Sequence, residues 1–175
     1  MNWNGFWAAA VAAALAWAAS GCTTYYLGSM LPGDVRTVFV PTCRNQTTEP
    51  FLEQDVTSAL MAALQTDGSL KVAGEKEADT VLRVTITGFA LDPVAYESGT
   101  SNTTEEYRMT LTASYVLTRR ADGTVVAEGT SVKGWEDFDF TGDLTSSKAV
   151  ALRPAAEDLG RRIVNALVMY WPEEP

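Results

Sequence analysis

The chain has 175 residues, a formal net charge of −9 and no histidine. The acidic balance argues against nucleic-acid binding, because that activity needs basic residues against the phosphates. The lack of histidine excludes Ser-His-Asp and Cys-His nucleophile systems and histidine-ligated metal sites. The chain also has no glycine-rich phosphate loop, so we expect a protein that is not an enzyme and carries no cofactor.

The chain begins with an apolar run over residues 6–19 that ends at Ser20-Gly21-Cys22. The run is shorter than the ~20 residues that span a bilayer, and small residues follow it, as in a signal peptide. A cysteine directly after Ala-Ser-Gly resembles the lipobox of bacterial lipoproteins, in which this cysteine is acylated and becomes the new N-terminus. The resemblance implies a removed signal peptide over residues 1–21 and lipidation at Cys22.

Residues 22–34 are polar and contain Pro32-Gly33, which is typical of a tether before a folded domain. In lipoproteins that resemble this one, an Asp directly after the acylated cysteine often marks inner-membrane retention. Thr23 at that position therefore implies the outer membrane. Two other interpretations stay open, because Ala19 stands where a Leu is usual and residues 1–7 hold no Lys or Arg: a buried Ala-rich helix, or a plain secreted protein.

The remainder, residues 35–172, is expected to form one domain. An apolar, β-branched run over residues 37–40 predicts a buried strand that ends at Pro41. Pro50 opens a helical pattern whose apolar positions recur at helical spacing as far as Leu64, and Gly68 is a plausible stop. Residues 70–73 predict a second strand, parallel to the first because a helix connects them.

The middle of the chain changes to a period of two. Residues 80–91 and 108–118 alternate apolar and polar side chains, which predicts two long strands. The polar stretch between them, residues 93–107, is expected to form a long exposed hairpin loop. Asp122-Gly123 then turns the chain into a third long strand over residues 124–140, so these strands form an antiparallel meander.

The last third is predicted to be helical. Asp143 caps a helix from Leu144, Pro154 is expected to kink or restart it, and an apolar face continues to Tyr170. The whole pattern predicts an α+β fold: a two-layer α/β sandwich with one mixed four- to five-stranded sheet and two main helices on one face, in the order β-α-β-β-β-β-α.

Helices on one face leave the other face of the sheet open. There the alternation places a polar, threonine-rich set of side chains: Arg83, Thr85, Thr87, Arg108, Thr110, Thr112 and Ser114. This set has two interpretations, an ordinary solvated sheet face or a contact surface for a polar partner or ligand.

Two further groups of residues were considered as sites. The acidic residues Glu136, Asp137, Asp139 and Asp143 lack the spacing and central glycine of an EF-hand loop, so we interpret them as strand alternation before a capped turn and expect no metal. Cys43 is interpreted as a small buried residue beside the first strand, with a reactive or intermolecular thiol as the alternative.

Several passages together resemble the LptE family of lipopolysaccharide-assembly lipoproteins. Residues 40–50 follow the pattern V-P-x-x-x-N-x-T-x-E-P that leads into the first helix of family members. The other matching passages are residues 25–32 after the cysteine, residues 35–41, Ala78-Asp79, residues 106–111 and residues 158–164.

The resemblance implies a non-enzymatic protein. Family members plug the lumen of the outer-membrane β-barrel LptD, help it assemble and help deliver lipopolysaccharide to the cell surface. It implies a domain anchored by acyl chains on the periplasmic face of the outer membrane, with lipopolysaccharide as a further ligand. A threonine-rich sheet face suits a hydrated lumen, and Arg83 and Arg108 are the candidates for contact with lipid A phosphates. The alternative is a periplasmic adaptor lipoprotein of another secretion or envelope-assembly complex.

Overall fold

The computed structural model describes residue 31 and residues 34–96 and 104–169. The predicted signal peptide over residues 1–21, the lipidation site Cys22 and nearly all of the tether lie outside the described residues, as do residues 97–103 and 170–175. Within the part of the chain that is described, no helix is both long and apolar enough to span a membrane.

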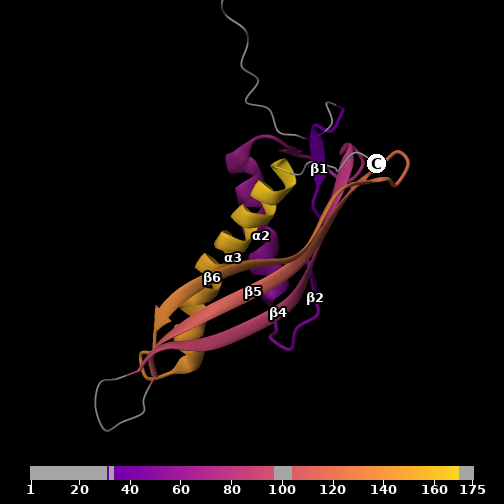
Figure 1. Ribbon diagram of the computed structural model, residues 1–175. Coiled ribbons are helices and arrows are strands. Elements are labelled where there is room, and N and C mark those ends of the chain that lie inside the picture. Colours follow the sequence, from indigo (N-terminus) through magenta and orange to yellow (C-terminus); the bar gives the residue numbers. More distant parts are fainter. Residues whose placement is uncertain (1–30, 32–33, 97–103, 170–175) are drawn as a thin grey trace, which may run out of the picture.

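One mixed sheet forms the first layer, and two helices form the second (Figure 1). The strand order is β3-β1-β4-β5-β6, with β2 also paired to β4. Strand β1 is parallel to β3 and β4, whereas β4, β5 and β6 form the antiparallel meander. This confirms the predicted α+β fold and adds the two-residue strand β2. The elements are β1 (Thr37–Phe39), β2 (Arg44–Asn45), α2 (Leu52–Asp67), β3 (Lys71–Val72), β4 (Thr80–Tyr96), β5 (Thr104–Arg119), β6 (Val125–Asp139) and α3 (Leu144–Val168).

Helix α2 follows the predicted apolar spacing. Leu52, Val56, Leu60 and Leu64 are buried against the sheet. Gly68 ends the helix in the left-handed conformation, with φ of 75°, and its N–H donates to the Leu64 carbonyl at 3.0 Å. A glycine adopts this conformation without steric cost, so it readily ends a helix. The predicted stop at Gly68 is confirmed.

The sequence predicted a kink or restart at Pro154. Helix α3 is instead one continuous element that does not restart there. The cap is as predicted, because Asp143 accepts hydrogen bonds from the backbone N–H groups of Thr145 and Ser146. A proline inside a helix leaves the carbonyl four residues earlier without its donor. That residue is Val150, which is 77% exposed, so water reaches its carbonyl and the helix continues.

The β4–β5 hairpin extends into the segment that was expected to be a loop. Strand β4 continues to Tyr96 and β5 begins at Thr104, with Pro93 opposite Tyr107 and Asp92 opposite Arg108. The expectation of a long exposed hairpin loop over residues 93–107 was therefore wrong for residues 93–96 and 104–107, which are paired in strands, and residues 97–103 lie outside the described residues. Proline is tolerated there because β1 and β2 pair only with the first part of β4, so Pro93 lies where the other side of β4 is a free edge.

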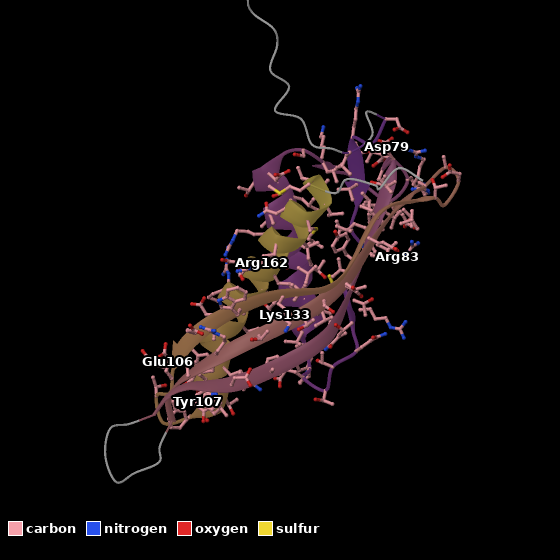
Figure 2. All side chains as sticks on the ribbon, in the orientation of Figure 1. Asp79, Arg83, Glu106, Tyr107, Lys133 and Arg162 are labelled. Carbon is pink, nitrogen blue, oxygen red and sulfur yellow. The ribbon has the colours of Figure 1, made fainter. Side chains whose placement is uncertain are left out.

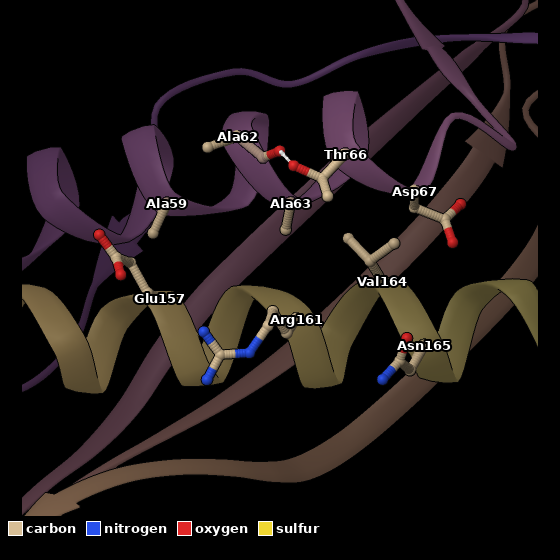
Figure 3. A pocket seen from close by; sticks show the side chains of 9 residues that line it. All are labelled: Ala59, Ala62, Ala63, Thr66, Asp67, Glu157, Arg161, Val164 and Asn165. Carbon is tan, nitrogen blue, oxygen red and sulfur yellow. Dashed lines mark hydrogen bonds between the residues drawn. The ribbon is translucent and has the colours of Figure 1, made fainter.

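Two glycines let α3 approach its neighbours closely. A Cβ on Gly134 of β6 would lie 2.3 Å from the backbone nitrogen of Leu159 on α3. A Cβ on Gly160 would lie 3.0 Å from the carbonyl oxygen of Ala59 on α2. Helix α3 is thus held against the sheet on one side and against α2 on the other, and the two helices run side by side in the same direction (Figures 1 and 3).

Two β-bulges lie at the same level of the sheet, on either side of β5. One is at Thr87 of β4, where Ile86 and Gly88 face successive residues of β5. The other is in β6, where Gly129 and Val132 flank two residues that oppose one residue of β5, and Ser131 has φ of 57°. Bulges bend strands, and the long strands curve around the helices, which leaves the open face convex (Figure 1).

Candidate functional site

The open face of the sheet carries the predicted polar side chains. On β4, Leu82, Val84 and Ile86 are buried under the helices, and the residues between them face the other way. On β5 the buried side chains are Met109, Leu111, Ala113, Tyr115 and Leu117. The sheet therefore brings together the predicted hydroxyl residues on its uncovered side. They are Thr85 and Thr87 on β4, and Thr110, Thr112 and Ser114 on β5, all partly or fully exposed.

The two arginines predicted to meet phosphate do not form one site. Arg83 lies in the first part of β4, whereas Arg108 pairs with Asp92, nine residues further along that strand. At about 3.3 Å per residue the two positions are roughly 30 Å apart. Any ligand that contacted both side chains would have to extend along most of the sheet.

Arg108 is engaged by a neighbouring carboxylate. Its Nε and one terminal nitrogen each donate to Asp137 of β6 at 2.7 Å, in a bidentate pair. The pair raises the pKa of Arg108 and lowers the pKa of Asp137, chiefly through these hydrogen bonds. The charge of Arg108 is thus already compensated, and a phosphate would have to compete with Asp137 for the same donors.

Two cations that the sequence interpretation missed share the open face with Arg83. Arg44 of β2 is paired in register with Thr85, and Lys133 of β6 is paired with Thr112. Both side chains are exposed, and Figure 2 shows Arg83 projecting on the side of the sheet away from the helices. We call Arg44, Arg83 and Lys133 the cationic band.

The outer edge of β6 is fastened to α3. The N–H of Trp135 donates to Asp158 at 3.1 Å, and Arg162, labelled in Figure 2, donates to the same carboxylate oxygen at 2.7 Å. The Arg162 guanidinium also lies 3.8 Å from the centre of the Trp135 ring. An edge strand exposes backbone N–H groups that can pair with a strand of another molecule. The bond to Asp158 occupies one of these donors, the N–H of Trp135.

Asp79 has a structural role at the start of β4. Its carboxylate accepts hydrogen bonds from the Thr37 hydroxyl at 2.7 Å and from the backbone N–H groups of Thr37 and Arg36. These bonds, led by that of the Thr37 hydroxyl, lower the pKa of Asp79. All three bonds end on one carboxylate oxygen, Oδ2, and they join β1 to the start of β4.

A shallow groove of about 390 Å³ runs between the two helices on the side away from the sheet (Figure 3). Ala59, Ala62 and Ala63 of α2 form one wall, and Glu157 and Arg161 of α3 stand opposite. In the described part of the chain, no cluster of three His, Cys, Asp or Glu residues is arranged to hold a metal ion. Cys43 is buried, and burial raises the pKa of its thiol.

Comparison with known proteins gives one family match. The family model described as LptE, lipopolysaccharide-assembly, matches residues 35–167. No curated protein matches the chain significantly.

Solved structures share the fold at low sequence identity. A protein described as a lipoprotein from Caulobacter crescentus CB15 aligns with a TM-score of 0.52 and 12% identity, over 75% of this chain and 87% of that one. Protein XCC0632 from Xanthomonas campestris aligns with a TM-score of 0.53 and 15% identity, over 76% and 84% of the two chains. At these identities the likeness concerns the fold alone.

Proposed function

The chain belongs to the LptE family of lipopolysaccharide-assembly proteins, and from this we propose that it is a non-enzymatic outer-membrane lipoprotein that plugs an LptD-type β-barrel. In this role it helps the barrel assemble and helps deliver lipopolysaccharide to the cell surface. The family match over residues 35–167 carries the proposal, because it covers almost the entire folded domain.

The N-terminal segment supports a membrane location. The apolar run over residues 6–19 and the cysteine that follows it have the arrangement of a lipoprotein leader. Cleavage before Cys22 and its acylation leave residues 22–34 as a tether to a domain over residues 35–172. The acyl chains then hold this domain at the periplasmic face of the outer membrane.

The open sheet face supports a position inside a barrel. The interior of an outer-membrane barrel is polar and hydrated. Hydroxyl side chains such as Thr85, Thr112 and Ser114 both donate and accept hydrogen bonds, so they pair equally well with a polar wall or with trapped water. The convex curvature of the face also suits the concave inner wall of a barrel (Figure 1).

The test is recovery of the complex from the membrane. The tagged lipoprotein is purified from outer membranes solubilised in mild detergent, and its partners are identified by mass spectrometry. We expect a large β-barrel protein in about equal amount, a diacyl or triacyl group on Cys22, and reduced surface lipopolysaccharide after depletion. Recovery of the lipoprotein only in free form, with normal surface lipopolysaccharide after depletion, would show that the proposal is wrong.

The same experiment addresses the adaptor alternative. Co-purification with a secretion pore or another envelope complex, in place of an LptD-type barrel, would assign the chain to that complex. A Cys22→Ala variant is the matched control for the anchor, because it removes the acylation site and leaves residues 35–172 unchanged.

A further inference from the structure

The cationic band crosses the middle of the open sheet face. Arg44 lies on β2, Arg83 on β4 and Lys133 on β6. The path from β2 through β4 and β5 to β6 contains three strand spacings of about 4.8 Å, so the outer cations are about 14 Å apart across the sheet. Thr85, Thr112 and Ser114 occupy the positions between them.

The charges of the band are not neutralised within the protein. Among the residues that the structure describes, no carboxylate lies within ion-pair distance of Arg44, Arg83 or Lys133, and Arg83 donates only to the Thr118 hydroxyl at 3.3 Å. The closest acidic position in register on this face is Glu128, two strand spacings or about 10 Å from Arg83. Six other cations do have acidic partners: Arg108, Arg119, Lys148, Arg153, Arg161 and Arg162.

This pattern runs against the composition of the chain. Acidic residues outnumber basic ones by 22 to 13, yet no carboxylate pairs with any of the three cations of the band. Among the described residues outside the band, Lys71, Lys76 and Arg120 also have no ion pair. The uncompensated band therefore gives the middle of the open face a local positive charge, opposite in sign to the net charge of the molecule. Such a face attracts an acidic surface and sets its orientation.

The spacing of the band decides between two kinds of anionic partner. A single phosphate group is bound by donors that converge on it within hydrogen-bond distance. Cations spread over about 14 Å do not converge in this way; they match separate carboxylates on a broad wall. The wall of a β-barrel presents side chains in rows at the same strand spacing, which a sheet face with hydroxyls between its cations can follow.

We propose that the open sheet face docks against an acidic patch on the lumen wall of the barrel, with Arg44, Arg83 and Lys133 facing its carboxylates. This inference rests on the proposed function and adds to it the surface that makes the contact and the charge of the partner. The helical layer, with its alanine-lined groove, then faces away from that patch.

The test reverses two charges of the band in the full-length lipoprotein in its own membrane. Arg44→Glu combined with Lys133→Glu changes two exposed side chains, and a thermal melt monitored by circular dichroism verifies that the fold is retained. Lys76→Glu combined with Arg120→Glu is the matched control, because it changes the net charge equally at exposed positions outside the band that have no ion pair. Barrel recovery with each protein is measured over a range of salt concentrations.

We expect the band variant to recover about tenfold less barrel than the control. Wild-type recovery should also fall with salt more steeply than that of the variant. A photo-crosslinking amino acid at position 85 should form adducts with an acidic stretch of the barrel wall, whereas one at position 62, in the helical groove, should form none with that stretch.

The outcomes separate this inference from the proposed function. Equal recovery of the barrel by the band variant and the wild type would overturn the inference and leave the proposed function intact. Loss of co-purified lipopolysaccharide with normal barrel recovery would also overturn it, because the band would then serve an anionic glycolipid. Absence of any barrel with the wild-type protein would refute the proposed function, and the inference with it.

Discussion

Replacing Gly134 by alanine tests the close packing of α3 on the sheet. The added Cβ would lie 2.3 Å from the Leu159 nitrogen and 2.5 Å from its Cα. Both are backbone atoms, so no side-chain rotation relieves the clash, and α3 must move about 1 Å from β6 to restore an ordinary contact. A gap of this size forfeits a quarter to a half of the dispersion energy of the contacts it opens.

We expect Gly134→Ala to lower the free energy of unfolding by about 3 kcal/mol, at the upper end of the cost of overpacking a core. With a urea dependence of about 2 kcal/mol per molar, the midpoint of unfolding falls by about 1.5 M. The measurement is urea unfolding followed by circular dichroism.

Gly88→Ala is the control, because it is also within a long strand. A Cβ there meets only the partly exposed Thr112 side chain, at 3.3 Å, and alanine lowers the conformational entropy of the unfolded chain. We expect a midpoint close to that of the wild type. If the urea midpoint of Gly134→Ala equals that of the control, then β6 and α3 are not packed so closely that only glycine fits at position 134, and the reasoning is refuted.

Four further predictions follow from local contacts. Asp143→Ala removes the cap of α3 and should lower the melting temperature by a few degrees in calorimetry, whereas Asp143→Asn should restore most of the loss. The pKa of Asp79 is lowered in the folded protein from 3.8, so the stabilising effect of this carboxylate is present above that pH and is lost as the pH falls through the folded pKa. Below about pH 4, the free energy of unfolding should therefore decline less steeply with falling pH for Asp79→Asn than for the wild type. Cys43 is 3% exposed and the pKa of its thiol is raised by burial, so iodoacetamide should modify it only in denaturant, and equal rates in buffer and urea would contradict this. Asp158→Ala removes the acceptor shared by Trp135 and Arg162 and should change the tryptophan fluorescence spectrum, which Asp55→Ala should leave unchanged.

The alternation of side chains was sufficient to predict the layers and the open face. Period-two patterns predicted two long strands, the turn at Asp122-Gly123 indicated the third, and helical spacing with Gly68 and Asp143 predicted the end of α2 and the start of α3. These signals are local, because they depend on residues within one element. The whole open set from Arg83 to Ser114 therefore appears on the uncovered face.

Features that depend on pairing between elements were not predictable in this way. The bond between Arg108 and Asp137 joins residues 29 positions apart and requires the register of β5 against β6. Arg44 lies in a segment whose composition indicates a turn, and only its pairing with β4 places it beside Thr85. The length of the β4–β5 hairpin was underestimated for a related reason, since backbone pairing continues through polar residues and Pro93 where the opposite edge is free.

The bulge at Thr87 has a consequence for insertions and deletions. Before it, even-numbered residues of β4 point toward the helices; after it, odd-numbered residues such as Phe89 and Leu91 pack against the core. Deletion of Thr87 would remove only the extra residue: Gly88 would stay opposite Thr112 and Phe89 opposite Leu111, so Phe89 and Leu91 would remain in the core while β4 lost its bend. The curvature of the open face therefore depends on a single additional residue in β4, whereas the polarity of that face does not.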